Sequence, residues 1–166
     1  MRIFPALLLC AAALVAAGGP RRAPGFALMD MKGEMHDLAD YRGKVVVLEF
    51  MQSTCPHCAS FVDILQKAQK KYGDQVAILA VGNPPADSPA TMNQYIAGHQ
   101  ITYPVMLDCG QVAYSYVLKG KIDLPTVYVI DAKGMIAGEY TYSVLTRGFF
   151  EGNELFTDLD RLLKAR

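Results

Sequence analysis

A continuous apolar run from Lys44 to Phe50, KVVVLEF, constrains the fold of this chain more than any other stretch. The run is rich in β-branched residues, which is typical of a strand buried on both faces of a parallel sheet. A helical pattern follows and ends near Gly73. Its apolar residues share one helix face, and they are Phe61, Ile64, Leu65, Ala68 and Tyr72. A buried strand followed by a helix indicates an α/β fold.

The alternation of strand and helix patterns continues along the chain. In order, the patterns are a buried strand at 75–82, a helix at 89–99, an edge strand at 102–108, a short helix at 110–118, a hairpin at 125–142 and a last helix at 153–164. Asp87 or Ser88 caps the helix that Pro89 opens. Ahead of the first strand, DMKGE at 30–34 predicts a tight turn between two short extended pieces. We therefore expect an α/β fold whose mixed sheet has a parallel centre, a C-terminal hairpin and helices on both faces.

The first 19 residues are typical of a secretory signal rather than of a folded domain. Arg2 precedes an apolar run from Ile3 to Ala17, and small residues follow that run. The run is short for a membrane span, since a spanning helix needs about 20 apolar residues. We expect an exported protein with one domain over residues 20–166, and both cleavage of the signal and its retention as a membrane anchor stay open. Cys10 is interpreted as an apolar filler of the signal.

The sequence CPHC at 55–58 carries the strongest chemical signal. Cys55 comes soon after a buried strand and opens a helix, where backbone N–H groups and the positive end of the helix dipole stabilise a thiolate. Pro56 suits the first helical turn, and His57 adds a group that can carry positive charge beside the sulfur. Cys58 lies one turn inward. Two thiols in this arrangement can form and reopen a disulfide, as thiol–disulfide exchange requires.

Three other functions of the cysteine pair fit less well. A structural zinc site needs four ligands, and only Cys109, His36 and His99 are left, singly and far apart. Covalent haem attachment needs a histidine directly after the second cysteine. An inert disulfide across two residues at a helix start would be unusual. We interpret both histidines as solvent-facing polar residues, and Cys109 either as a small buried hydrophobe or as a third redox thiol.

Two further residues stand out against their surroundings. Glu49 lies inside the apolar run, where burial would raise the pKa of its carboxyl. It either accepts the proton of Cys58 or reaches solvent or a lysine at the strand end. Pro125 precedes a strand that should lie close to the active helix. From the residues alone it is a strand-start proline, and a trans peptide bond is its ordinary state.

The chain resembles the thioredoxin-like family, and specifically the exported TlpA/ResA-like branch of the alkyl-hydroperoxide-reductase/thiol-antioxidant superfamily. The resemblance covers about 25–164 and rests on the lead-in at 26–50, on CPHC, on YPVMLD, on DLPTVYVIDAKGMI and on the order of elements. It implies a thioredoxin fold in which Cys55 attacks and Cys58 resolves. It also implies a cis Pro125 facing the disulfide, a Leu124 backbone that binds substrate peptide, and a Glu49 that accepts a proton.

The resemblance also implies the partners, which are protein thiols and disulfides together with a membrane-bound electron relay. No metal, nucleotide or flavin site is visible in the sequence, so no cofactor is expected. The 16 basic and 16 acidic residues balance, whereas a nucleic-acid binder normally has a basic excess.

The family pattern is not matched everywhere. Thr54 replaces the usual aromatic residue before the first cysteine, and the chain has no tryptophan. The Pro-His pair is that of the oxidant DsbA, whereas reductases of this branch usually carry other pairs, so the direction of electron flow stays open. Two other functions also stay open: a thiol peroxidase, although Gln52 stands where peroxiredoxins carry Thr or Ser, and a peptide-binding module without turnover.

Overall fold

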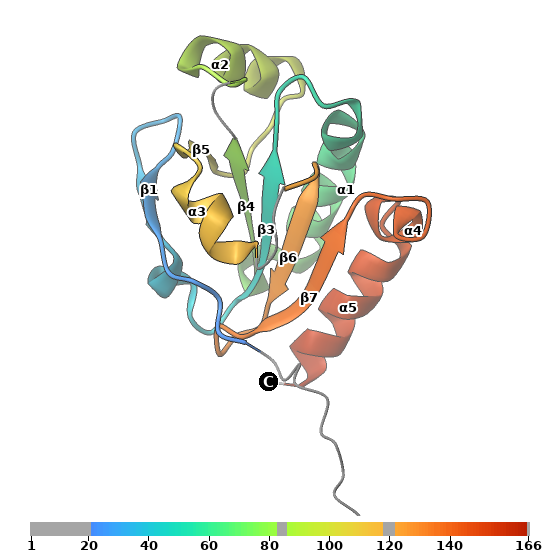
Figure 1. Ribbon diagram of the computed structural model, residues 1–166. Helices are drawn as coiled ribbons and strands as arrows, with labels where there is room; N and C mark the ends of the chain where they lie inside the picture. Colours follow the sequence, from blue (N-terminus) through green and yellow to red (C-terminus); the bar gives the residue numbers. More distant parts are fainter. Residues whose placement is uncertain (1–20, 83–85, 118–121, 166) are drawn as a thin grey trace, which may run out of the picture.

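Figure 1 shows the computed structural model, which describes residues 21–82, 86–117 and 122–165. The expected secretory signal and Cys10 lie outside these residues. Among the helices described, none combines the length and the apolar character that crossing a membrane would require.

A five-stranded mixed sheet forms the centre of the molecule, with the strand order β5-β4-β3-β6-β7 (Figure 1). The strands are β3 (Val45–Met51), β4 (Val76–Gly82), β5 (Val105–Leu107), β6 (Thr126–Ile130) and β7 (Ile136–Thr141). Strands β3, β4 and β5 are parallel to one another, whereas β6 and β7 are antiparallel additions. The sheet is therefore the predicted one, with a parallel part, an edge strand and a closing hairpin.

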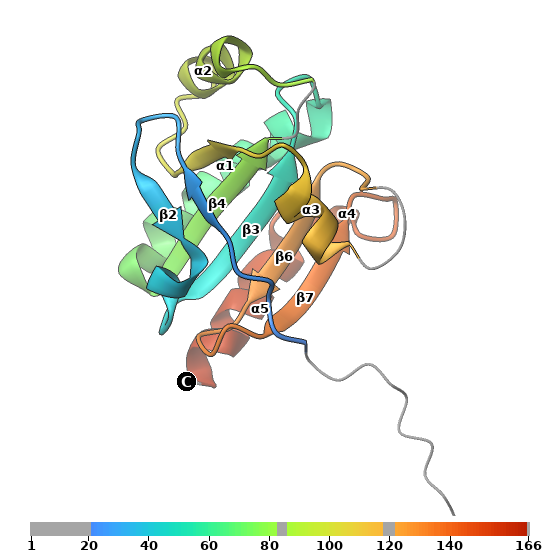
Figure 2. The ribbon, with the colours of Figure 1, turned by 60° about the vertical axis from the view of Figure 1, so that its left-hand side comes forward.

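Helices cover both faces of the sheet, as the sequence predicts. The helices are α1 (Pro56–Tyr72), α2 (Pro89–Gly98), α3 (Gln111–Tyr116), α4 (Arg147–Phe150) and α5 (Asn153–Lys164), with short 3₁₀ turns at Leu38–Tyr41 and Gly73–Gln75. Helices α1 and α5 lie against one face, and α3 lies against the other together with the lead-in segment (Figures 1 and 2). Ser88 caps α2 by accepting the backbone N–H of Thr91, which settles the choice between the two expected caps.

The central strand β3 is buried along its whole length because its side chains alternate between two cores. Val45, Val47 and Met51 belong to the core that α1 and α5 cover. Val46, Leu48 and Phe50 belong to the opposite core, beneath α3. Glu49 occupies a position on the α1 face, between Val47 and Met51. This placement brings a carboxyl into the same layer as the start of α1.

A two-stranded hairpin precedes the sheet and lies beside β5. Its strands are β1 (Ala27–Met29) and β2 (Met35–Asp37), joined by the predicted turn. The backbone N–H of Met31 donates to the Val105 carbonyl at 2.9 Å, which ties the turn to the edge of the main sheet. The hairpin is thus attached next to edge strand β5 without being a member of the central sheet.

Two expectations about single residues are wrong. His36 is buried rather than solvent-facing, because the middle residue of β2 points inward. Cys109 is exposed rather than buried. Asp108 takes the buried position beside it and accepts the backbone N–H groups of Gly110 and Val112, so the chain turns outward at Cys109. His99 is exposed, as expected.

Candidate active site

Cys55 is the N-cap residue of α1, directly after the turn that leaves β3. Its backbone N–H donates to the Gln52 carbonyl at 3.0 Å, and its Sγ accepts the backbone N–H of Cys58 at 3.2 Å. The sulfur therefore occupies the place of a capping oxygen at the positive end of the helix dipole. Pro56 follows at the first helical position, where its missing N–H costs nothing. Cys55 is partly exposed whereas Cys58 is buried, so Cys55 is the member of the pair that a partner can reach.

Cys58 is the enclosed member of the pair. Its side chain is fully buried, at 0% exposure. Burial raises the pKa of the Cys58 thiol, and the negative charge of Glu49 raises it further. Cys58 therefore needs a proton acceptor before it can act as a nucleophile, because the thiolate and not the thiol attacks a disulfide.

Glu49 is 1% exposed and lies in the middle of β3, where Ala80 and Val127 are its neighbours across the sheet. Burial raises the pKa of its carboxyl to about 8. Its Oε1 has no hydrogen-bond partner among the described residues, nor do the buried hydroxyls of Tyr95 and Tyr103. The interpretation of Glu49 as a strand-end residue that reaches solvent is therefore wrong.

The segment before β6 faces the cysteine pair from the other side. The Leu124–Pro125 peptide bond is cis, as the resemblance implies. The Leu124 carbonyl lies 3.9 Å from Sγ of Cys55, at the distance of a weak hydrogen bond from the thiol. Leu124, the residue before the cis proline, thus lies beside the Cys55 sulfur, where the resemblance implies it.

Tyr142 is a site residue that the sequence analysis missed. Its ring stacks on the imidazole of His57, with ring centroids 3.8 Å apart and an interplanar angle of 17°. Its backbone N–H donates to the Pro125 carbonyl at 3.0 Å. The hairpin register pairs Thr126 with Thr141, the last residue of β7, so the residue that follows the strand, Tyr142, lies opposite Pro125. Counting back from the hairpin turn would have placed Thr141 there instead, because a β-bulge between Val129 and Ile130 shifts the register by one residue.

Asp87 is the second missed residue. The sequence suggested it as a helix cap, but its Oδ1 instead accepts the backbone N–H of Ser53 at 2.9 Å. The side chain is buried. This bond joins the loop before Cys55 to the segment that leads into α2. Asp87 therefore supports the backbone that presents the attacking sulfur.

The described residues around the two cysteines hold no metal-site cluster. The single grouping of three or more metal-ligand side chains found in the described part of the chain lies elsewhere, at Asp30, Glu34 and His36. The described cysteines are all free thiols. The geometry around CPHC is that of a dithiol without further ligands.

A model of the AhpC/TSA family matches residues 20–138, which is more than half of the chain. The chain belongs to the AhpC/TSA family. Within the family's thioredoxin-like relatives, protein YneN of Bacillus subtilis is 31% identical over 117 residues, which cover 70% of this chain and 67% of YneN. Thiol-disulfide oxidoreductase ResA of Geobacillus kaustophilus is 32% identical over 118 residues, covering 69% of this chain and 64% of ResA. The matched part thus spans about two thirds of these relatives.

Solved structures support the same placement of this AhpC/TSA chain. The exposed lipoprotein thioredoxin of Streptococcus pneumoniae has a TM-score of 0.63 and 25% identity, over 80% of this chain and 99% of that one. A thiol:disulfide interchange protein of the thioredoxin family from Chlorobium tepidum has a TM-score of 0.67, over 84% of this chain and 98% of that one. Its 22% identity speaks to the fold alone. The predicted thioredoxin fold and the TlpA/ResA-like resemblance are confirmed.

Proposed function

We propose that this protein is a thiol–disulfide oxidoreductase that exchanges disulfides with exported protein partners through Cys55 and Cys58. The observation that carries the proposal is the asymmetry of the pair. Sγ of Cys55 is accessible and accepts a backbone N–H at the start of α1, whereas Cys58 is enclosed one turn further on. Relatives named thiol-disulfide oxidoreductase support it.

The exchange proceeds in two balanced steps. The Cys55 thiolate attacks one sulfur of a partner disulfide, forms a mixed disulfide and releases the partner's other sulfur as a thiolate. Cys58 then gives its proton to the carboxylate of Glu49 and attacks Sγ of Cys55. This forms the Cys55–Cys58 disulfide and releases the reduced partner. The reverse sequence oxidises a partner dithiol.

The pKa of Glu49 suits this role. With a pKa of about 8, the carboxyl is ionised in part of the molecules near neutral pH and can take up a proton from a nearby thiol. An ordinary carboxylate would be a weaker base. Among the described residues no hydrogen bond holds its Oε1 in another interaction.

The surrounding residues orient the partner and the outer sulfur. We assign the backbone of Leu124 and Pro125 to binding an extended partner segment beside Cys55. We assign Pro56 and His57 to stabilising the Cys55 thiolate, with Tyr142 holding the imidazole by stacking. Together these groups surround the Cys55 sulfur on one side.

The proposal places the protein outside the cytosol, in the periplasm or an equivalent compartment. The support is the signal pattern of residues 1–19, and retention of that segment would anchor the domain to the membrane. Electrons would then pass between the dithiol and a membrane-bound protein relay.

Replacing Cys58 with alanine tests the proposal directly. In C58A the mixed disulfide forms on Cys55 but cannot be resolved, so covalent partner complexes accumulate and separate on non-reducing gels. C55S is the matched control and should trap nothing, and C109S should behave as wild type in turnover. A C58A protein that binds partners only non-covalently would instead support a peptide-binding module.

The reduction potential assigns the direction of electron flow. A value near −120 mV measured against glutathione would mark an oxidant of the DsbA kind, and a value near −270 mV a reductant of the thioredoxin kind.

A further inference from the structure

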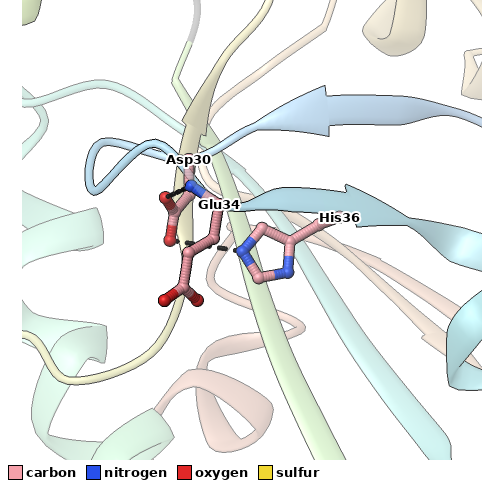
Figure 3. A group of neighbouring side chains, drawn as sticks. All are labelled: Asp30, Glu34 and His36. Carbon is pink, nitrogen blue, oxygen red and sulfur yellow. Dashed lines mark hydrogen bonds and ion pairs between the residues drawn. The ribbon is translucent and has the colours of Figure 1, made fainter.

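A second cluster of polar side chains lies in the β1–β2 hairpin, and the proposed redox chemistry does not use it. Figure 3 shows Asp30, Glu34 and His36, with an imidazole nitrogen facing the carboxylates. One ligand atom from each residue can be chosen so that all of them lie within 4.8 Å of one another. We propose that these three side chains bind a divalent transition-metal ion, of which Zn²⁺ is the best match.

The donor set fits such an ion chemically. One imidazole nitrogen and two carboxylates are ligands that Zn²⁺ accepts, and three protein ligands with a water in the fourth position form a common zinc arrangement. Ca²⁺ and Mg²⁺ prefer oxygen donors only, so His36 disfavours them. The exposed side of Glu34 leaves room for the water.

The distances also fit. Nε2 of His36 lies 3.2 Å from Oδ2 of Asp30. Two ligands bound to one tetrahedral Zn²⁺ at about 2.0–2.1 Å stand roughly 3.3 Å apart. This edge of the coordination shell is therefore already in place. Glu34 completes the site by a rotation of its exposed side chain.

His36 supplies the observation that points to a ligand. The residue is 9% exposed, and its Nε2 makes no hydrogen bond with a described residue but lies at ion-pair distance, 3.2 Å, from Oδ2 of Asp30. Its Nδ1 lies 2.6 Å from the Tyr41 hydroxyl. When Nδ1–H donates to that oxygen, the lone pair of Nε2 faces Asp30 and Glu34. A second-shell bond of this kind is what fixes a metal-binding imidazole.

Asp30 is prepared in the same way. Its Oδ1 accepts the backbone N–H groups of Lys32 at 2.8 Å and Glu34 at 2.9 Å, which leaves Oδ2 for the ion. An ion held here would join both strands of the hairpin next to its contact with β5.

An ion pair between Asp30 and His36 alone would also explain the 3.2 Å contact, and the experiment separates the two. Isothermal titration of Zn²⁺ uses the C10S/C109S protein with the Cys55–Cys58 disulfide closed, so that no thiol can bind the metal. We expect saturable one-to-one binding and a higher Tm with Zn²⁺. Co²⁺ should give a visible spectrum of nitrogen and oxygen ligation without thiolate bands.

Matched variants locate the ion. Glu34→Gln keeps the fold, because the residue is exposed, and should weaken Zn²⁺ binding at least about 10-fold. Tyr41→Phe should weaken it about 10–100-fold through the second shell. Asp40→Asn removes the same charge from an exposed neighbour that is not a ligand, and should leave binding unchanged. No binding up to about 1 mM Zn²⁺, or equal binding by Glu34→Gln and wild type, would overturn the proposal.

Discussion

Glu49 shows how the importance of a single residue can be inferred from the difference between its side chain and those of its neighbours. A carboxylate in an apolar strand must be neutralised, paired or used, because burying its charge alone is costly. The structure buries it in the same layer as Cys58 and raises the pKa of the carboxyl to about 8. The sequence therefore located the group, and its burial excludes the interpretation that it reaches solvent, while its role as proton acceptor stays a prediction.

Replacing Glu49 with glutamine should slow the second step of exchange and leave the first unchanged. In E49Q, Cys58 must lose its proton to water, and burial raises the pKa of that thiol. We expect the resolving step to fall about 10²-fold near neutral pH. In wild type its rate should climb with pH through about 8, and in E49Q the rise should move to higher pH.

Stopped-flow reaction of the reduced C10S/C109S protein with Ellman's reagent measures both steps. The first release of thionitrobenzoate reports attack by Cys55, and the second reports resolution by Cys58. C58A is the control that lacks the second release. An unchanged second phase in E49Q would remove Glu49 from the mechanism.

The burial of other single residues could not be predicted from the sequence, for a physical reason. His36 lies in a three-residue strand, which is too short for alternation to show which side faces inward. Cys109 lies in a turn whose direction depends on the bonds that Asp108 makes. Cys55, Cys58 and Pro125 were found because their chemistry is unusual for their positions.

At the scale of elements, long periodic segments were predictable and short ones were not. The last helix was predicted at Asn153–Lys164 and is found there, because its apolar stripe repeats over three turns. Helix α4 has four residues and was not predicted. No periodic signal exists over so short a length, and tertiary contacts hold it in place.

Those contacts form an aromatic cluster around α4. Phe149 stacks on Tyr140 with ring centroids 3.8 Å apart, and it also packs against Phe61 of α1 and the neighbouring Phe150. Phe150 in turn contacts Tyr142, which stacks on His57. Helix α4 therefore packs between α1 and β7, and through Phe150 it contacts Tyr142 at the site.

Phe149→Ala should lower the free energy of unfolding by about 3–5 kcal/mol, because the removed ring leaves a cavity in a fully buried position. Urea unfolding measures this. Leu145→Ser is the control in the same segment, and with Leu145 93% exposed its effect should stay within about 0.5 kcal/mol. A similar cost for both variants would contradict the buried role of α4.

At the scale of the whole molecule, the sheet places the residues of the cysteine site at one end. The turn after β3, the start of α1, the loop before β6 and the end of β7 meet there. Alternating strand and helix patterns predicted the mixed sheet and its two covered faces. The approach of Tyr142 and Asp87 to the site depends on strand register and loop path, which hydrophobic patterns do not encode.

The buried carboxyl should make the stability of the whole fold depend on pH. The carboxyl has a pKa of about 8 in the folded protein and about 4.3 when unfolded. Because its pKa is higher in the folded protein, the carboxyl contributes in full to the free energy of unfolding below about pH 4.3. This contribution is lost as the pH rises towards 8. Between about pH 5.5 and 8 the loss is at most about 3 kcal/mol, at about 1.4 kcal/mol per pH unit.

Urea unfolding of the disulfide form at pH 5.5 and at pH 8 measures this loss of stability. No active-site thiol titrates in that form. E49Q should lack this part of the pH slope. Parallel slopes for the two proteins would show that the carboxyl is not buried in its neutral form.

The enclosure of Cys58 within the fold has a consequence for the lifetime of the covalent complex with a partner. A partner can bond only to the outer sulfur, so every encounter passes through one mixed disulfide at Cys55. In the proposed mechanism, the lifetime of that bond is set inside the fold, chiefly by the proton transfer from Cys58 to Glu49, and not by how firmly the partner is held. Such a protein can serve many weakly bound partners without losing control of when each is released.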